Sequence, residues 1–238
     1  MHKEILTKEQ IELLSLLQEF SKDFILVGGT AIALHLGHRR SIDFDLFSNK
    51  KFNNRAIYQK INRYWKIDKT YLSAVGEYTL MVNKIKMTFF EFGHIIEAVE
   101  KLDKIIRFPD LLTLAAMKSF VLGFRGKWKD YVDLYFIIRD YYSVEEISKK
   151  AQEIFKGEFN ERILREQLAY FDDINYREAV EFLPGLEVSE KEIKKTGGIQ
   201  LGVERFLALL NRSRRISVFL VYGFCLLPSD EGRIEEGC

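Results

Sequence analysis

Residues 41–47, SIDFDLF, alternate polar and apolar side chains as a half-buried β-strand does. Successive side chains of a strand point to opposite faces, so Asp43 and Asp45 share one face, and the other face is apolar, with Ile42, Phe44 and Leu46. Aspartate is uncommon in strands, and two neighbouring carboxylates repel each other. The pattern therefore indicates either a solvated edge strand or a carboxylate pair that a bound cation holds together.

A divalent metal would supply that cation. Mg²⁺ binds one or two carboxylates together with phosphate oxygens, and a pair of carboxylates on one strand presents this arrangement to a nucleoside triphosphate. We expect Asp43 and Asp45 to be metal ligands if the strand is functional.

A glycine pair lies upstream of the acidic strand. The apolar run at 24–27 predicts a short strand that Gly28 and Gly29 end, and Thr30 then opens a helix, AIALHL. Glycines let the backbone approach a ligand closely, and a helix N-terminus attracts phosphate. Alternatively, the glycines only make the turn and Thr30 only caps the helix.

A basic loop connects this helix to the acidic strand. Arg39, Arg40 and Ser41 come directly before Asp43, where they could balance its charge or contact phosphate. The alternative is an ordinary surface loop.

Lys118 lies in residues 111–124, a stretch that is apolar nearly all the way round and therefore predicts a buried helix. A buried ammonium is costly without a partner. We expect Lys118 to meet a carboxylate of the protein or a phosphate of a ligand, unless its side chain reaches solvent. Arg125 follows two turns later on roughly the same face.

The next predicted helix carries two aspartates. Asp130 and Asp133 are three residues apart and share a face of residues 130–140. Asp130 is alternatively a helix cap, and Lys129 alternatively pairs with a neighbouring acidic residue.

The remaining patterns predict an α/β (α+β) fold with a mixed sheet flanked by helices and a helical C-terminal part. Thr7 and Gln10 form a capping box for a first helix that runs to about Lys22, and Asn53 caps a helix over 55–65. Three strand-like runs within 69–92 predict an antiparallel meander. From Ser143 to about Lys195 the chain is expected to be wholly helical. We therefore expect a core at 1–140, a helical subdomain at 141–195 and a tail at 196–238 whose structure the patterns do not predict.

Composition narrows the function classes. The chain of 238 residues has 36 basic and 35 acidic side chains, so its net charge of +1 gives no general attraction for nucleic acid. Its cysteines, Cys225 and Cys238, form neither a disulfide framework nor a zinc pattern, which favours a reducing cytoplasm. The N-terminus lacks the pattern of a signal peptide, and the longest apolar run, 216–227, is too short to span a membrane.

Several of these segments together resemble a known family. VGGTAIALHLGHRRSIDFDLF closely resembles the first motif of the AbiEii/AbiGii toxin nucleotidyltransferases, within the polymerase-beta-like superfamily. KMTFFEF, LLTLAAMKSFVLGFRGKWKDYVDLYFI and LAYFDD continue the similarity in order, over roughly residues 1–195. The tail beyond Lys195 does not match the family.

The resemblance implies a nucleotidyltransferase core and a set of site residues. The glycine pair and the following hydroxyl residue would hold the triphosphate, and the two aspartates would bind magnesium. A helical lysine and a lysine–aspartate motif complete the site in this family, with Arg125 and Asp133 nearby. These roles imply Gly28, Gly29, Thr30, Asp43, Asp45, Lys118, Lys129 and Asp130.

The resemblance also implies a reaction and partners. A nucleotide from an NTP would be transferred to an acceptor hydroxyl, with tRNA as a candidate acceptor. The enzyme would be the toxin of a toxin–antitoxin or phage-defence pair, with a cognate antitoxin as partner. A small-molecule nucleotidyltransferase of the aminoglycoside type is a second hypothesis. A noncatalytic nucleotide-binding module is a third, because many superfamily enzymes carry a third carboxylate on a later strand where this chain offers Thr88.

Overall fold

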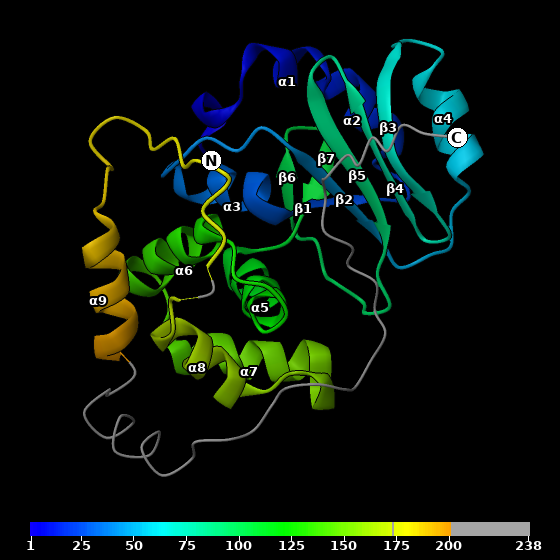
Figure 1. Ribbon diagram of the computed structural model, residues 1–238. Coiled ribbons are helices and arrows are strands. Elements are labelled where there is room, and N and C mark those ends of the chain that lie inside the picture. The colour runs from blue at the N-terminus through cyan, green and yellow to red at the C-terminus, as the bar shows by residue number, and fades with distance from the viewer. Residues whose placement is uncertain (173, 201–238) are drawn as a thin grey trace, which may run out of the picture. The chain divides into compact units, whose positions relative to one another are not determined.

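A five-stranded mixed sheet is the frame of the fold, as predicted (Figure 1). The computed structural model describes residues 1–172 and 174–200, all within one unit that spans Met1–Val203. The strands lie in the order β1-β2-β5-β4-β3. Their bounds are β1 Ile25–Val27, β2 Phe44–Ser48, β3 Ile67–Ala74, β4 Glu77–Val82 and β5 Ile85–Glu91.

Strand β2 lies inside the sheet and not at an edge. It pairs antiparallel with β1 and parallel with β5, and Asp45 lies opposite Val27 on one side and Thr88 on the other. Strands β3, β4 and β5 form the predicted antiparallel meander. The edge-strand alternative for the acidic segment is therefore wrong.

The two faces of the sheet differ in burial. Phe44 and Leu46 are fully buried, as are Met87 and Phe89 of β5. Phe20 of α2 (Leu14–Phe20) packs against Phe89, with ring centroids 4.8 Å apart. The opposite face carries Asp45, Lys86 and Thr88, which are partly exposed. One face is thus core, and the other presents polar groups.

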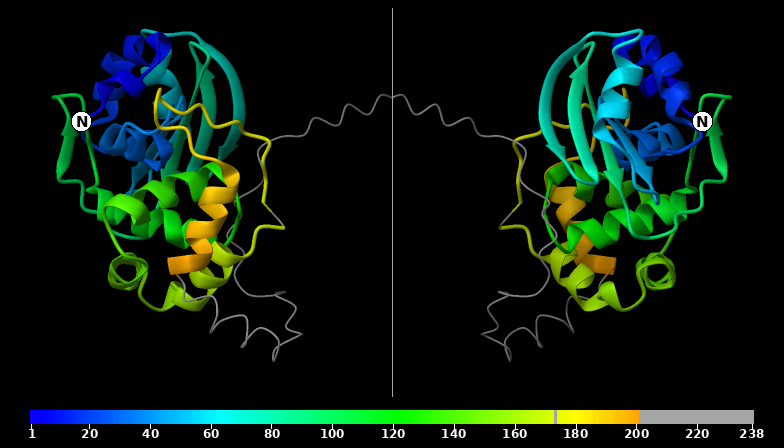
Figure 2. Two further views of the ribbon diagram at one scale, coloured as in Figure 1. Left: turned by 90° about the vertical axis from the view of Figure 1, so that its left-hand side faces the viewer. Right: turned by 90° about the vertical axis from the view of Figure 1, so that its right-hand side faces the viewer.

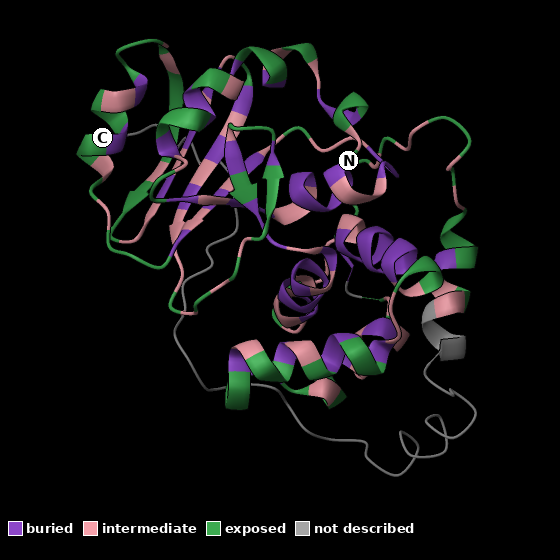
Figure 3. Cartoon of the chain, turned by 180° about the vertical axis from the view of Figure 1, so that it is seen from behind, coloured by how far each residue is buried: buried purple, intermediate pink, exposed green. Residues whose placement is uncertain are grey.

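Most of the helices follow the sheet in the chain. Figures 1 and 2 show α5 to α9 gathered below it, with the segment between α8 and α9 rising back to the level of α3. Helices α5 and α6 are largely buried (Figure 3). The bounds are α1 Lys8–Glu12, α3 Gly28–Leu36, α4 Asn54–Ile61, α5 Leu111–Leu122, α6 Trp128–Asp140, α7 Val144–Phe155, α8 Glu161–Ala169 and α9 Glu190–Gln200, with short 3₁₀ turns at Lys3–Ile5 and Lys156–Glu158.

Capping signals were reliable guides to where helices begin. The capping boxes at Thr7 and at Ser143 are present, and the side chain of Asn53 accepts hydrogen bonds from the first turn of α4. Ser189 likewise accepts from the backbone amide of Glu192. These residues satisfy amides that have no partner inside the helix.

Three expectations about local structure were wrong, and one element was not predicted. The first helix is interrupted at Leu13 and forms α1 and α2, and α3 begins at Gly28 and not at Thr30. Residues 174–189 are not helical, contrary to the expectation of a wholly helical segment up to about Lys195. The hairpin of β6 (Glu100–Leu102) and β7 (Ile106–Phe108) was not predicted.

The expected boundaries at residues 140 and 195 stay predictions. Most of the predicted tail, 201–238, lies outside the described residues. In the part of the chain that is described, no helix is long and apolar enough to cross a bilayer.

Candidate active site

The glycine pair lies directly against the acidic strand. Gly28 has φ +73°, a conformation that favours glycine, and a Cβ at this position would lie 2.2 Å from Oδ2 of Asp45. A Cβ on Gly29 would lie 2.7 Å from Nη2 of Arg39 and 3.0 Å from Oγ of Ser41. The turn therefore requires glycine at both positions, because its backbone contacts the carboxylate and the basic loop.

Thr30 connects this turn to the acidic segment. Its side chain is buried, and its hydroxyl donates to the backbone carbonyls of Asp43, at 2.5 Å, and Ser41, at 3.2 Å. The N-cap of α3 is Val27, so Thr30 is not the cap. In the structure the Thr30 hydroxyl positions the carboxylate segment, and its contact with a triphosphate stays a prediction.

The two aspartates lie together on the polar face of the sheet. Asp45 is in β2, whereas Asp43 precedes the strand, and Oδ2 of Asp43 lies 3.5 Å from Nζ of Lys86. Ile42 does not join the apolar face, since 53% of it is exposed. Phe44 and Leu46 are buried as predicted.

The charge of Asp45 is incompletely compensated. Burial, and then the neighbouring charge of Asp43, raise the pKa of Asp45, while Lys129, Lys86 and Arg125 act in the opposite direction. A site that disfavours its own carboxylate charge is suited to a cation. Two carboxylates are enough for Mg²⁺ when phosphate oxygens and water complete its shell. Within residues 1–172 and 174–200 no cluster of three or more His, Cys, Asp or Glu side chains forms a metal site from protein groups alone.

Beneath the glycine turn lies a buried ionic network. Asp133 accepts two hydrogen bonds from the guanidinium of Arg39, at 2.7 and 2.8 Å, and one from Nε2 of His38, at 2.8 Å. Lys118 lies 2.8 Å from Oδ1 of Asp130 and 3.1 Å from Oδ2 of Asp133. The two cations and two anions balance one another, so the network can be stable without solvent.

Ionisation in this network follows from its contacts. Burial opposes the charge of Asp133, but Arg39 and Lys118 hold its pKa well below the ordinary value. Burial lowers the pKa of His38 against the influence of Asp133, so the imidazole is neutral. Oδ2 of Asp130 is buried and has no hydrogen-bond partner among the described protein groups.

The contacts in this network distinguish between the sequence-based alternatives for Lys118, Arg39 and Asp130. Lys118 meets protein carboxylates, and its side chain does not reach solvent, being only 10% exposed. Arg39 is buried, so the surface-loop alternative is wrong for this residue. Asp130 does not cap α6, because its carboxylate pairs with Lys118. Asp130 and Asp133 share a face, as predicted.

Arg40 and Arg125 lie differently from the buried residues. The guanidinium of Arg40 pairs with Glu181 at 2.9 Å and donates weakly to the backbone of Glu4 and Ile5. Arg125 is exposed, and its charge acts on Asp45. Arg40 pairs with Glu181, and its contact with phosphate stays a prediction, whereas the charge of Arg125 acts on Asp45.

A segment that sequence reasoning had assigned to a helix completes the site. We call residues 175–183 the strap. Its Asn175 exchanges backbone hydrogen bonds with Gly126, at 2.7 Å, and Trp128, at 3.0 Å. Farther along, the carbonyl of Glu181 accepts from the amide of Arg40 at 2.8 Å, and the amide of Leu183 donates to His38 at 3.1 Å. The strap thus joins the start of α6 to the basic loop.

Three residues of this region were not predicted from the sequence. Lys86 lies on the same face of β5 as Thr88. Because side chains alternate along a strand, its position two residues before Thr88 could have identified it as a site residue. His38 precedes the basic pair, but no local signal indicated its burial. Glu178 lies in the strap and pairs with Lys127 and Lys129. Local sequence patterns cannot predict an ion pair between residues about 50 positions apart.

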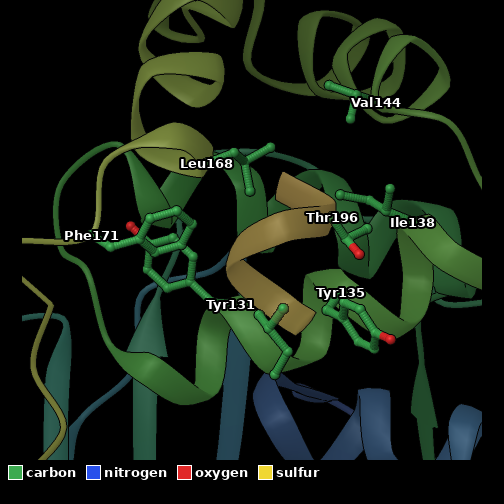
Figure 4. A pocket seen from close by; sticks show the side chains of 8 residues that line it. Tyr131, Tyr135, Ile138, Val144, Leu168, Phe171 and Thr196 are labelled. Carbon is green, nitrogen blue, oxygen red and sulfur yellow. The ribbon is translucent and has the colours of Figure 1, made fainter. Parts of the chain in front are cut away.

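Asp43 and Asp45 line neither of two cavities elsewhere in the structure. The first, of about 20 Å³, holds roughly one water and lies between α6, α8 and α9, where Tyr131, Tyr135 and Leu168 contribute to its wall (Figure 4). The second, of about 220 Å³, lies at the opposite end of β2 beside Phe47 and Lys50. The first is too small for a nucleotide.

Part of the chain matches a known family. Residues 13–74 match the family model described as nucleotidyl transferase AbiEii toxin, Type IV TA system. Residues 13–74 are therefore similar to the AbiEii nucleotidyltransferase toxin domain. The matched range contains the glycine pair and both aspartates and ends before Lys86 and Lys118.

Similar proteins extend the match beyond residue 74. An uncharacterised protein of Aquifex aeolicus is 29% identical over 197 residues, which cover 80% of this chain and 95% of that protein. A Helicobacter pylori protein assigned as a nucleotidyltransferase aligns with a TM-score of 0.50 at 14% identity, over 87% of this chain and 97% of its own. MenT4, a nucleotidyltransferase toxin of Mycobacterium tuberculosis, aligns with a TM-score of 0.51 at 11% identity, over 82% of each chain. The solved structures show that the fold is that of a nucleotidyltransferase.

Proposed function

We propose that this protein is a toxin nucleotidyltransferase that transfers a nucleotide from an NTP to an acceptor hydroxyl. The acceptor oxygen forms a bond to the α-phosphorus, the bond from that phosphorus to the bridging oxygen breaks, and pyrophosphate leaves with the released electron pair. The acceptor proton passes to solvent or to a nearby base.

The observation that carries the proposal is the environment of Asp45. This carboxylate lies beside Asp43, directly against the backbone of Gly28, and the surrounding cations do not restore its ordinary pKa. The glycine turn brings backbone, and no side chain, against the pair. The uncompensated carboxylate charge favours a metal-bound triphosphate over a free anion.

Asp43 and Asp45 are the residues that would hold Mg²⁺, which supplies positive charge to the phosphate oxygens as negative charge develops. Lys86, Lys129 and Arg125 surround the carboxylates and would orient the phosphates of the NTP. Lys118 and Arg39 act from below, since both are engaged by Asp133 and keep the glycine turn in place.

Two observations bear on the identity of the acceptor. The family match and the likeness to a toxin fold favour tRNA as acceptor and a cognate antitoxin as partner. The net charge of +1 favours a small-molecule acceptor instead. Thr88 lies opposite Asp45, where a hydroxyl cannot act as a general base at neutral pH, so acceptor activation must come from another group.

A transfer assay tests the proposal. The native protein is incubated with each α-labelled NTP and Mg²⁺ and with total tRNA or an aminoglycoside mixture, in parallel with Asp45→Asn. Asp103→Asn is the matched control, because Asp103 is exposed and pairs with Lys3 away from the site.

Label transfer by the native protein and by Asp103→Asn, but not by Asp45→Asn, is the expected result. Labelled RNA would favour the toxin function, and labelled aminoglycoside would favour the small-molecule function. Equal labelling by native protein and Asp45→Asn would refute the assignment of the carboxylate. NTP binding without transfer to any acceptor would indicate the noncatalytic module.

A further inference from the structure

The middle of the strap places a negative charge at the candidate phosphate site. Glu178 accepts a hydrogen bond from Nζ of Lys127 at 2.6 Å and is also in contact with Nζ of Lys129. Burial opposes the ionisation of Glu178, but the hydrogen bonds from these lysines outweigh it and lower the pKa to about 2. Its charge also acts on Lys86 and Arg39.

Lys129 interacts with Glu178 and also with the carboxylate pair. Lys129 pairs with Glu178, and its charge also reaches Asp45. Lys86 likewise lies near Asp43 and within the field of Glu178. A carboxylate oxygen and a phosphate oxygen accept the same hydrogen bonds from an ammonium group. Glu178 thus occupies a position that suits a phosphate oxygen.

We propose that Glu178 is an internal competitor of the triphosphate, so that NTP binding requires the strap to release Lys127 and Lys129. This inference rests on the proposed function, because it assumes that the triphosphate binds beside Asp43 and Asp45. Glu178 and a phosphate group repel each other and cannot share the two lysines. The free energy needed to displace the Glu178 carboxylate therefore lowers the affinity for NTP. The strap thus sets the NTP concentration at which the site is half-saturated.

The geometry of the strap allows this exchange. Glu178 lies between the anchors at Asn175 and Glu181, and its side chain is 39% exposed, so it can turn toward solvent. Tyr176, next to one anchor, lies 5.3 Å from the indole of Trp128 between ring centroids. Movement of the strap would alter the surroundings of this indole.

The experiment measures affinity and strap position separately. Binding of Mg²⁺–tripolyphosphate, and of each NTP with Mg²⁺, is measured by calorimetry for the native chain, Glu178→Gln and Glu178→Ala. Glu181→Gln is the control, because Glu181 is in the same strap but pairs with Arg40. The chain has two tryptophans, so Trp65→Phe leaves Trp128 as the single emitter for a parallel fluorescence titration.

Both Glu178 variants are expected to bind roughly threefold to tenfold more tightly than the native chain, as removal of one like charge at a partly exposed site predicts. Glu181→Gln should bind as the native chain does, and ligand should change Trp128 emission in Trp65→Phe. Circular dichroism establishes that each variant is folded.

The outcomes separate the two proposals. Binding with equal or lower affinity in both Glu178 variants would overturn the competitor role and leave the nucleotidyltransferase proposal intact. An unchanged Trp128 emission on binding would show that the strap does not move. Failure of every protein to bind any of these ligands would overturn both proposals.

Discussion

Gly28→Ala is the substitution whose effect on the site can be worked out most directly. The added Cβ would lie 2.2 Å from Oδ2 of Asp45, 3.0 Å from Cγ and 3.2 Å from Cβ. Turning the carboxyl group alone does not relieve contacts with all three atoms. The whole Asp45 side chain must move, and the carboxylate leaves the position in which it would bind metal.

Two contributions set the magnitude. Gly28 has φ +73°, and a non-glycine residue in the left-handed region costs about 1–2 kcal/mol. For a chain of this size that loss lowers the melting temperature by roughly 2–8 °C. Restoring an ordinary contact requires Asp45 to retreat by roughly 1 Å, and a misplacement of that size lowers activity on the order of 100-fold.

Gly185→Ala is the matched control for the backbone contribution. Gly185 has φ +81°, and a Cβ there would meet nothing within 4 Å. Thermal unfolding should show a comparable loss of stability in both variants, whereas only Gly28→Ala should lose nucleotide transfer. If Gly28→Ala retains transfer within about threefold of Gly185→Ala, the proposed contact between the glycine turn and Asp45 does not govern the reaction.

Four further predictions concern charge and hydrogen bonding. In metal-free buffer Asp45→Asn should melt at a higher temperature than the native chain, because it removes an uncompensated charge, and Mg²⁺ with NTP should raise the melting temperature of the native chain only. Lys118→Met should lower the free energy of unfolding in urea by about 3–5 kcal/mol, and adding Asp130→Asn should recover part of that loss. Thr30→Val should cost about 1–3 kcal/mol in the same assay, whereas Thr30→Ser should retain both stability and transfer. The ion pairs of Glu178 lower its pKa to about 2 in the folded chain, compared with about 4.3 in the unfolded chain, so they stabilise the fold above about pH 4.3. The native chain should therefore have a free energy of unfolding on the order of 1 kcal/mol higher than that of Glu178→Gln at pH 5, and this difference should disappear as the pH falls to 2. An unchanged difference across that pH range would contradict the ion pair.

Local patterns predicted the parts of the fold that local physics decides. Period-two alternation placed Phe44 and Leu46 in the core, and it placed Asp45 and Thr88 on the partly exposed face. The capping box at Thr7 correctly marked a helix start because the interactions involved span only three residues. The buried position of Lys118 also followed from the apolar pattern of its own helix.

Long-range pairing accounts for most of what was missed. Arg39 pairs with Asp133 across 94 residues, and no local pattern distinguishes this buried arginine from the partly exposed Arg40 next to it. The non-helical strap was mistaken for helix because its backbone is held by pairing with the start of α6 and with the basic loop. Only the assembled fold brings Glu178 to Lys127 and Lys129.

The interior position of β2 has a consequence for how the two halves of the site behave in time. Its amides and carbonyls bond to strands on both sides, so opening β2 requires much of the sheet to open, and its amide protons should exchange with solvent at close to the rate of global unfolding. The described backbone hydrogen bonds between the strap and the rest of the chain lie near its ends, so amides around Glu178 should exchange far sooner than those of β2. The half of the candidate site on β2 is thus stiff, and the half on the strap, for which we propose the competitor role, is compliant.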